Sequence, residues 1–129
     1  MGKLAGLPLA NLQKMAVLSG LPSSQLHGYI MDFSLTAEQK MLQDTARRFA
    51  AEELPAHAKA IEENDTPPTL ALRKRFAEMG FMGINLPTEY GGAGLGHFEA
   101  VLILEELAKI SIAVAFPVFE ASFGPALAI

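Results

Sequence analysis

The segment that decides the fold lies at residues 86–96, which read Leu-Pro-Thr-Glu-Tyr-Gly-Gly-Ala-Gly-Leu-Gly. The step Glu105-Glu106-Leu107-Ala108 follows in the next segment. Glycine and proline at this density predict a tight, shaped turn. A phosphate-binding loop is the alternative reading. The glycine spacing fits neither the dinucleotide fingerprint nor the nucleoside-triphosphate loop, and no Lys-Ser or Lys-Thr follows, so the turn is favoured.

Helical signals flank this loop on both sides. Thr36 and Gln39 have the spacing of a capping box, which predicts a helix from about Ala37 to about Glu53. Pro55 fits the first turn of a second helix, which we expect to end near Glu63.

Three further apolar patterns complete the expected bundle. One contains Leu72, Phe76 and Met79 and ends at Gly80, where a left-handed residue is expected. The next has an apolar side formed by Ala100, Val101, Leu104, Leu107 and Ala108. The last covers residues 111–129, is almost wholly apolar and contains Pro117, which should kink that helix or force a local start. The sequence therefore predicts an all-α fold, a small orthogonal or up-down bundle of about five helices with a glycine-rich loop.

Composition limits the possible functions. The chain has 129 residues, of which 50% are apolar, and this suits one globular domain with a modest core. It has no cysteine, so it can form neither a disulfide nor a thiolate zinc site. Its net charge of −4 argues against a nucleic-acid partner. The apolar run at residues 110–119 is too short to span a bilayer.

Residues 1–30 differ in character from the remainder. They contain Lys3, Lys14 and His27 but no acidic residue, so the rest of the chain carries 8 basic against 14 acidic residues, a net charge of −6. The segment has neither a continuous apolar core, as in a secretory signal, nor the arginines of a mitochondrial transit peptide. We interpret it as an N-terminal extension of a domain at residues 31–129, or alternatively as a short helix from Leu9 to Leu18. A cytoplasmic location is the default expectation.

Residues 31–129 resemble the N-terminal helical domain of flavin-dependent acyl-CoA dehydrogenases. The resemblance is carried by the Phe33-Ser34-Leu35-Thr36 start, the Thr45–Phe49 stretch, the Met79-Gly80-Phe81 step, and the glycine loop with the Glu-Glu-Leu-Ala step. It implies the α,β-dehydrogenation of an acyl-CoA thioester with FAD as cofactor. Family members continue into a β-barrel and a C-terminal helical bundle, and we expect this chain to stop before both.

The same resemblance implies which residues meet the substrate. The helix after the Glu-Glu-Leu-Ala step forms the wall and floor of the acyl-chain pocket in that family, and counting along it without a gap gives Ala115, Phe119 and Phe123, with Glu120 beside them. The spacing i, i+4 and i+8 places the first three on one face of a helix, and packing in the core is the alternative role for them. The catalytic glutamate and most flavin contacts lie in the other domains, so no catalytic, cofactor-binding or metal-binding residue is assigned here. Glu99, Glu105, Glu106 and Glu120 are not assigned that role. Adjacent Glu105 and Glu106 would point about 100° apart on a helix, so they cannot act as a catalytic carboxylate pair, and we expect one of them to face solvent. His27, His57 and His97 are isolated in the sequence.

The resemblance also implies partners and leaves alternatives open. The expected partners are the acyl-CoA substrate, the barrel and C-terminal domains, and electron-transfer flavoprotein. The full-length form would be a homotetramer. A free-standing helical module that binds an acyl group or a protein is the alternative class. Within the enzyme class, an acyl-CoA oxidase or a flavin monooxygenase shares this helical domain.

Overall fold

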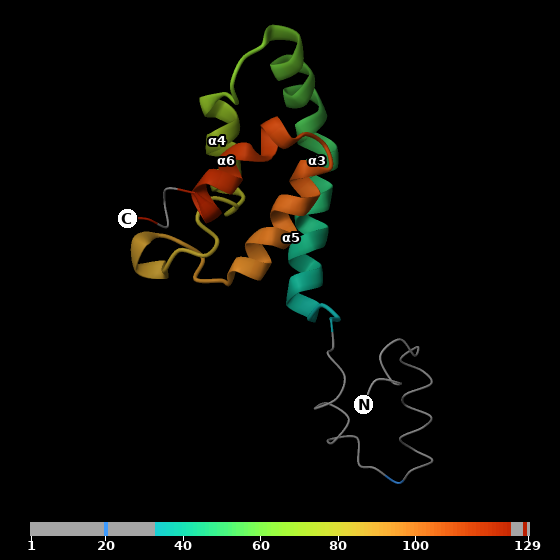
Figure 1. Ribbon diagram of the computed structural model, residues 1–129, viewed down its shortest axis with the longest axis vertical. Coiled ribbons are helices and arrows are strands. Elements are labelled where there is room, and N and C mark those ends of the chain that lie inside the picture. Colours follow the sequence, from blue (N-terminus) through green and yellow to red (C-terminus); the bar gives the residue numbers. More distant parts are fainter. Residues whose placement is uncertain (1–19, 21–32, 125–127, 129) are drawn as a thin grey trace, which may run out of the picture. The chain divides into compact units, whose positions relative to one another are not determined.

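A computed structural model describes residues 20, 33–124 and 128 of the chain (Figure 1). The chain divides into two units, Met1–Ser34 and Leu35–Ile129. The helix predicted at Leu9–Leu18 and nearly all of the expected extension lie outside the described residues.

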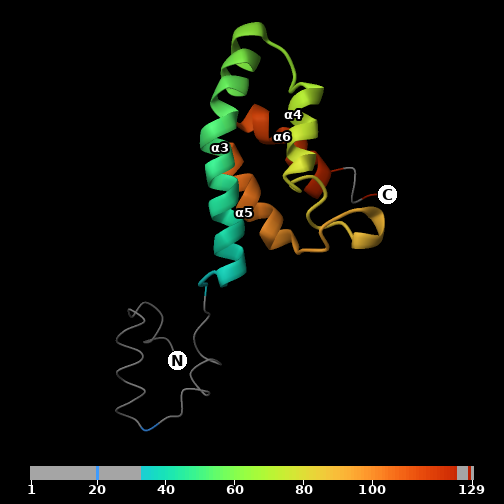
Figure 2. The same cartoon turned by 180° about the vertical axis from the view of Figure 1, so that it is seen from behind.

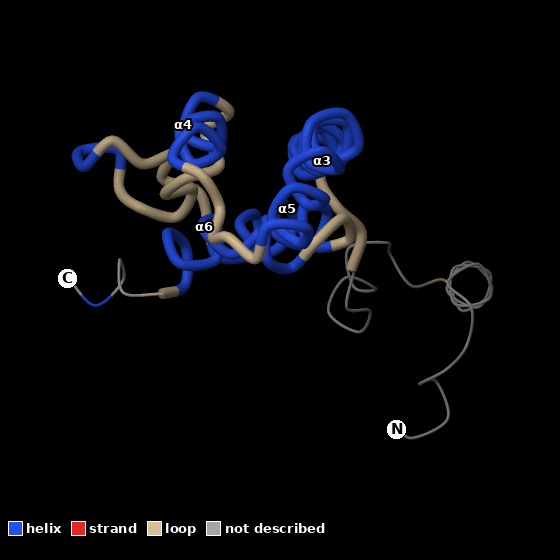
Figure 3. Tube along the Cα trace, turned by 90° about the horizontal axis from the view of Figure 1, so that it is seen from above, coloured by secondary structure: helices blue, strands red, loops and turns tan. Residues whose placement is uncertain are grey.

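The second unit is helical, as predicted. Its elements are listed in chain order: α3 at Ala37–Asn64, α4 at Leu70–Glu78, the short 3₁₀-helix η1 at Thr88–Tyr90, α5 at His97–Ala108 and α6 at Ile112–Phe123. The described part of the chain thus has four α-helices and no strand (Figure 3).

The start of α3 confirms the capping prediction. The Thr36 side chain accepts a hydrogen bond from the Gln39 amide at 3.1 Å, and the Gln39 side chain accepts one from the Thr36 amide at 3.0 Å. The predicted break before Pro55 is wrong, since α3 continues through Pro55 to Asn64. Leu54 and Ala58 on either side are both buried in the core. The burial of this continuous apolar side offsets the one backbone hydrogen bond that proline removes.

The end of α4 also agrees with the sequence. Gly80 adopts the left-handed conformation with φ of 75°. The Phe81 amide then donates to the Phe76 carbonyl at 2.9 Å, so the chain closes the helix and turns back. This closure places Phe81 edge-on against Phe49 of α3, with 5.4 Å between the ring centroids.

The helices enclose one core. Helix α5 packs along α3, and α6 packs against both of them (Figures 1 and 2). Viewed from above, α3 and α4 are both seen nearly end-on (Figure 3). The largest fully buried apolar side chains come from all four α-helices and from the segment after α4: Leu54, Leu72, Phe76, Phe81, Ile84, Ile103, Leu107, Val114 and Val118. Val101, which was expected on the apolar side of α5, is instead exposed, and Ile103 takes the buried position.

Candidate functional site

Helix α6 has one buried side. Ser111 caps its start, because the serine hydroxyl accepts a hydrogen bond from the Val114 amide at 3.5 Å. The buried residues are Val114, Ala115, Pro117, Val118 and Ser122. Pro117 lies inside the helix, which begins five residues earlier at Ile112. Of the two outcomes predicted for this proline, a kink or a local start, the local start is therefore wrong. Near its end, the side-chain amide of Asn85 donates to the Ser122 carbonyl at 2.8 Å and holds the helix to the loop.

The opposite side of α6 carries exposed apolar side chains. Ile112 is 76% exposed, Phe116 49% and Phe119 41%. With half-buried Phe123 they have the spacing i, i+4, i+7 and i+11, which places all four on one helical stripe. The domain buries the inner side of α6 and leaves this stripe open.

Three aromatic contacts join side chains along this stripe and beyond its end. The ring centroids of Phe116 and Phe119 are 5.8 Å apart, and those of Phe119 and Phe123 are 6.1 Å apart. The ring of His97, the first residue of α5, lies 5.9 Å from that of Phe123. We call these four residues the aromatic row.

The predicted pocket residues are therefore placed in different environments. Phe119 and Phe123 contact each other in the aromatic row. Ala115 is only 2% exposed and belongs to the core of the domain. Glu120 is partly exposed, and one of its carboxylate oxygens lies 3.8 Å from a guanidinium nitrogen of Arg73 on α4.

Two members of the aromatic row were not expected from the sequence. Phe116 could have been found from the sequence, because Ile112, Phe116, Phe119 and Phe123 have the spacing i, i+4, i+7 and i+11 of one helical stripe. His97 could not, because its contact with Phe123 joins residues from two helices.

The glycine loop has no free anion cradle. Every backbone amide from Gly91 to Gly96 donates a hydrogen bond to an oxygen of this chain, with N···O distances between 2.9 and 3.2 Å. Gly91 and Gly94 have φ of 80° and 66°, as a tight turn requires. The sequence prediction of a shaped turn is therefore confirmed, and no amide of this loop is left to bind a phosphate.

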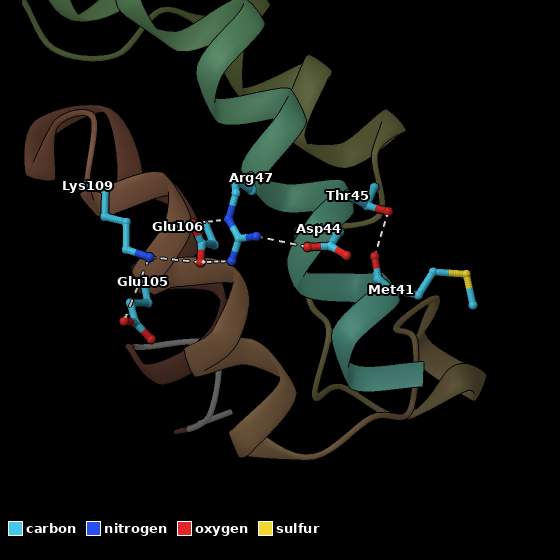
Figure 4. Close-up of polar contacts among 7 residues, drawn as sticks. All are labelled: Met41, Asp44, Thr45, Arg47, Glu105, Glu106 and Lys109. Atoms are coloured by element: carbon cyan, nitrogen blue, oxygen red, sulfur yellow. Dashed lines mark hydrogen bonds and ion pairs between the residues drawn. The ribbon is translucent and has the colours of Figure 1, made fainter. Parts of the chain in front are cut away.

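Glu106 is the charged side chain with least exposure among the described residues, only 2%. Its carboxylate accepts hydrogen bonds from Arg47 Nη2 at 3.1 Å and Nε at 3.3 Å, and from Lys109 Nζ at 2.9 Å (Figure 4). Asp44 holds Arg47 from the other side, with 2.9 Å between its Oδ1 and the Arg47 Nη1. This network connects α3 to α5.

The network fixes the ionisation of Glu106. Burial alone would raise the pKa of Glu106, but the hydrogen bonds and charges of Arg47 and Lys109 outweigh it and lower the pKa below the ordinary value of 4.5. A carboxylate held by two cations in this way is poorly suited to act as a general base. Its neighbour Glu105 is exposed, so the expectation that one of the two glutamates faces solvent is confirmed.

This lowered pKa predicts an acid-sensitive domain. Above pH 4.5 Glu106 is ionised in both the folded and unfolded states, and its interactions stabilise the fold in full. As the pH falls from 4.5 through the lower folded-state pKa, the unfolded state takes up the proton first and that stability is lost. We expect the free energy of unfolding, measured by urea titration between pH 7 and pH 3, to fall less steeply in Glu106→Gln than in the parent. Parallel curves would contradict this assignment.

Glu99 is also held by hydrogen bonds within the chain. Glu99 accepts hydrogen bonds from the Gln39 side chain at 2.8 Å and from the Gly96 amide at 3.0 Å, which lowers its pKa. It therefore connects the start of α5 to the start of α3.

No group of three or more metal-binding side chains gathers in the part of the chain that the structure describes. Nor is any helix among those residues long and apolar enough to cross a membrane.

Comparison with known families decides the relationship. The family described as "Acyl-CoA dehydrogenase, N-terminal domain" matches residues 36–128, which include all four helices and the glycine loop. The chain belongs to the acyl-CoA dehydrogenase family. Two of the motifs that indicated this family contact each other, since Arg47 of the Thr45–Phe49 stretch and Glu106 of the Glu-Glu-Leu-Ala step are partners in one ion-pair network.

Individual proteins are also similar to this chain. The 3-sulfinopropanoyl-CoA desulfinase of Paraburkholderia xenovorans is 37% identical over 71% of this chain and 24% of its own length. The benzylmalonyl-CoA dehydrogenase of Aromatoleum aromaticum is 42% identical over 66% of this chain and 22% of its own length. The mitochondrial isovaleryl-CoA dehydrogenase of Bos taurus is 38% identical over 62% of this chain and 19% of its own length. The chain thus spans about a fifth to a quarter of these relatives.

The flavin of acyl-CoA dehydrogenases needs a site for its pyrophosphate. The glycine loop does not fit that need, because its amides already donate within the chain. The three arginines and lysines at residues 73–75 do not supply it either: Arg73 faces Glu120 and Arg75 is held by Glu53 and Glu78. Neither the glycine loop nor this pair of arginines therefore offers free donors for a pyrophosphate.

Proposed function

We propose that this chain is the N-terminal helical domain of an enzyme that dehydrogenates acyl-CoA thioesters, and that α6 forms part of the wall of its acyl-chain pocket. The observation that carries this proposal is that Ile112, Phe116 and Phe119 are exposed on one side of α6, while the other side of this helix is buried in the core. Exposed large apolar surfaces on a small domain mark sites of ligand or domain contact.

Within this wall the four predicted residues have distinct parts. Phe119 and Phe123 would contact the acyl group, because their rings lie in the aromatic row. Ala115 would contribute from below, as a small residue in the core that lets α6 pack closely. Glu120 would stand at the edge of the wall, with its charge balanced by Arg73.

The reaction itself requires groups beyond this chain. The proton-abstracting carboxylate, the FAD site, the barrel and the C-terminal bundle would belong to other parts of a longer protein. That protein would be a cytoplasmic homotetramer, with electron-transfer flavoprotein as its electron acceptor. Residues 1–30 would be an extension to the domain at residues 31–129. The three relatives are named for different acyl groups, so their names do not identify the substrate of this chain.

Phe119→Ala tests the pocket wall in the full-length protein. Phe119 and Phe123 should shorten or flatten the cavity, since overfilling a packed site is costly. We therefore expect Phe119→Ala to broaden the chain-length preference, measured as kcat/KM for straight acyl-CoA thioesters of increasing length. The matched control is Leu70→Ala, which removes an exposed apolar side chain on α4 outside the row. An unchanged length profile in Phe119→Ala would remove this assignment.

A further inference from the structure

The aromatic row is a continuous series of tilted ring contacts. Its members, Phe116, Phe119, Phe123 and His97, are joined by successive centroid distances of 5.8, 6.1 and 5.9 Å. The planes of Phe116 and Phe119 differ by 31°, those of Phe119 and Phe123 by 34°, and those of His97 and Phe123 by 50°. Glu120, next to Phe119 in the sequence, pairs with Arg73 at 3.8 Å.

The spacing within the row is that of favourable aromatic pairs. Rings prefer offset or tilted contacts with centroids about 4.5–7 Å apart, and each such pair gains energy beyond the apolar area that it buries. Phe116 and Phe119 are each more than two-fifths exposed, so their rings still have surface for a further partner. A flat aromatic ligand can therefore add another tilted contact to the row.

A long alkyl chain has less to gain from the same surface. It makes only dispersion and desolvation contacts with a ring, and to lie straight it would have to pass two bulky side chains, Phe119 and Phe123. Phenylalanine has only two side-chain torsions, and the ring contacts between neighbours restrict them further. The wall is consequently suited to a short, flat group.

We propose that the acyl group bound against α6 ends in an aromatic ring, which packs against Phe119 and Phe123. This inference rests on the proposed function, because it names the substrate class of the same pocket wall. In this proposal the aromatic row of this chain recognises the ring of the acyl group.

The test is a binding measurement on the full-length protein with two unreactive CoA thioethers of equal carbon number, 3-phenylpropyl-CoA and nonyl-CoA. Isothermal titration calorimetry gives the Kd of each, with free CoA as the reference. We expect 3-phenylpropyl-CoA to bind more tightly than nonyl-CoA by about fivefold or more, the factor that corresponds to one aromatic contact. Phe119→Leu and Phe123→Leu should each reduce this ratio, because each removes one of the two rings that the ligand contacts. Leu70→Ala, outside the row, should leave the ratio unchanged.

The failures of the two proposals are distinguishable. If nonyl-CoA binds as tightly as 3-phenylpropyl-CoA or more tightly, the aromatic substrate class is overturned and the pocket stands. The same holds if the preference survives in Phe119→Leu and Phe123→Leu. If neither thioether binds better than free CoA, the acyl pocket itself is overturned, and the substrate class falls with it.

Discussion

Gly92→Ala should destabilise the domain by about 3 kcal/mol or more, because a side chain at this position has no space. A Cβ built on Gly92 would overlap the carbonyl group of Leu86, which is backbone and cannot rotate away. The same carbonyl accepts the Gly94 amide at 2.9 Å, so any shift would also break the loop's own hydrogen bond. The free energy of unfolding, measured by urea titration followed by circular dichroism, checks this value.

Gly91→Ala is the matched control in the same loop. A Cβ there meets no atom within 4 Å, and the only cost is the left-handed φ of 80°. That conformation costs a non-glycine residue about 1–2 kcal/mol. We expect Gly91→Ala to be the milder variant. If Gly92→Ala were as stable as Gly91→Ala, Gly92 would not lie as close to the Leu86 carbonyl as the structure shows.

Glu106→Lys should destabilise the domain by about 3–5 kcal/mol, the cost of leaving buried charge without a partner. The substitution would place a third cation beside Arg47 and Lys109 at a site that is 98% shielded from solvent. Helices α3 and α5 would lose the network that connects them. Thermal or urea unfolding of the purified variant measures the loss.

The adjacent glutamate provides the control. Glu105 is exposed and lies 4.0 Å from Lys109, a surface pair that contributes little. Glu105→Lys should change the free energy of unfolding by about 0.5 kcal/mol or less. If both substitutions lowered the free energy of unfolding equally, the burial of Glu106 would not be the reason for its contribution to stability.

Local signals in the sequence predicted the parts of the fold that depend on residues close to each other along the chain. The capping box at Thr36 and Gln39 and the left-handed Gly80 are such signals, because each acts within four residues along the chain. The break at Pro55 was wrong for the opposite reason. Tertiary burial of Leu54 and Ala58 decides that helix, and a local pattern contains no information about what packs against it.

The candidate site shows the same division. Helical geometry predicted that Glu105 and Glu106 point in different directions, but not which of them is buried, since the partner Arg47 is 59 residues away in sequence. Spacing placed Phe119 and Phe123 together. It could not show that Ala115 is covered by the core, nor that His97 of another helix extends the aromatic row.

An acyl group bound in a longer protein should cover the open side of α6. Hydroxyl-radical footprinting of the full-length protein, first with free CoA and then with a bound acyl-CoA, measures this cover. We expect acyl-CoA, and not free CoA, to protect Phe119 and Phe123 from labelling, while Tyr90 of η1, exposed in the glycine loop, stays equally labelled. Equal labelling of Phe119 and Phe123 in both states would show that no acyl group lies against α6.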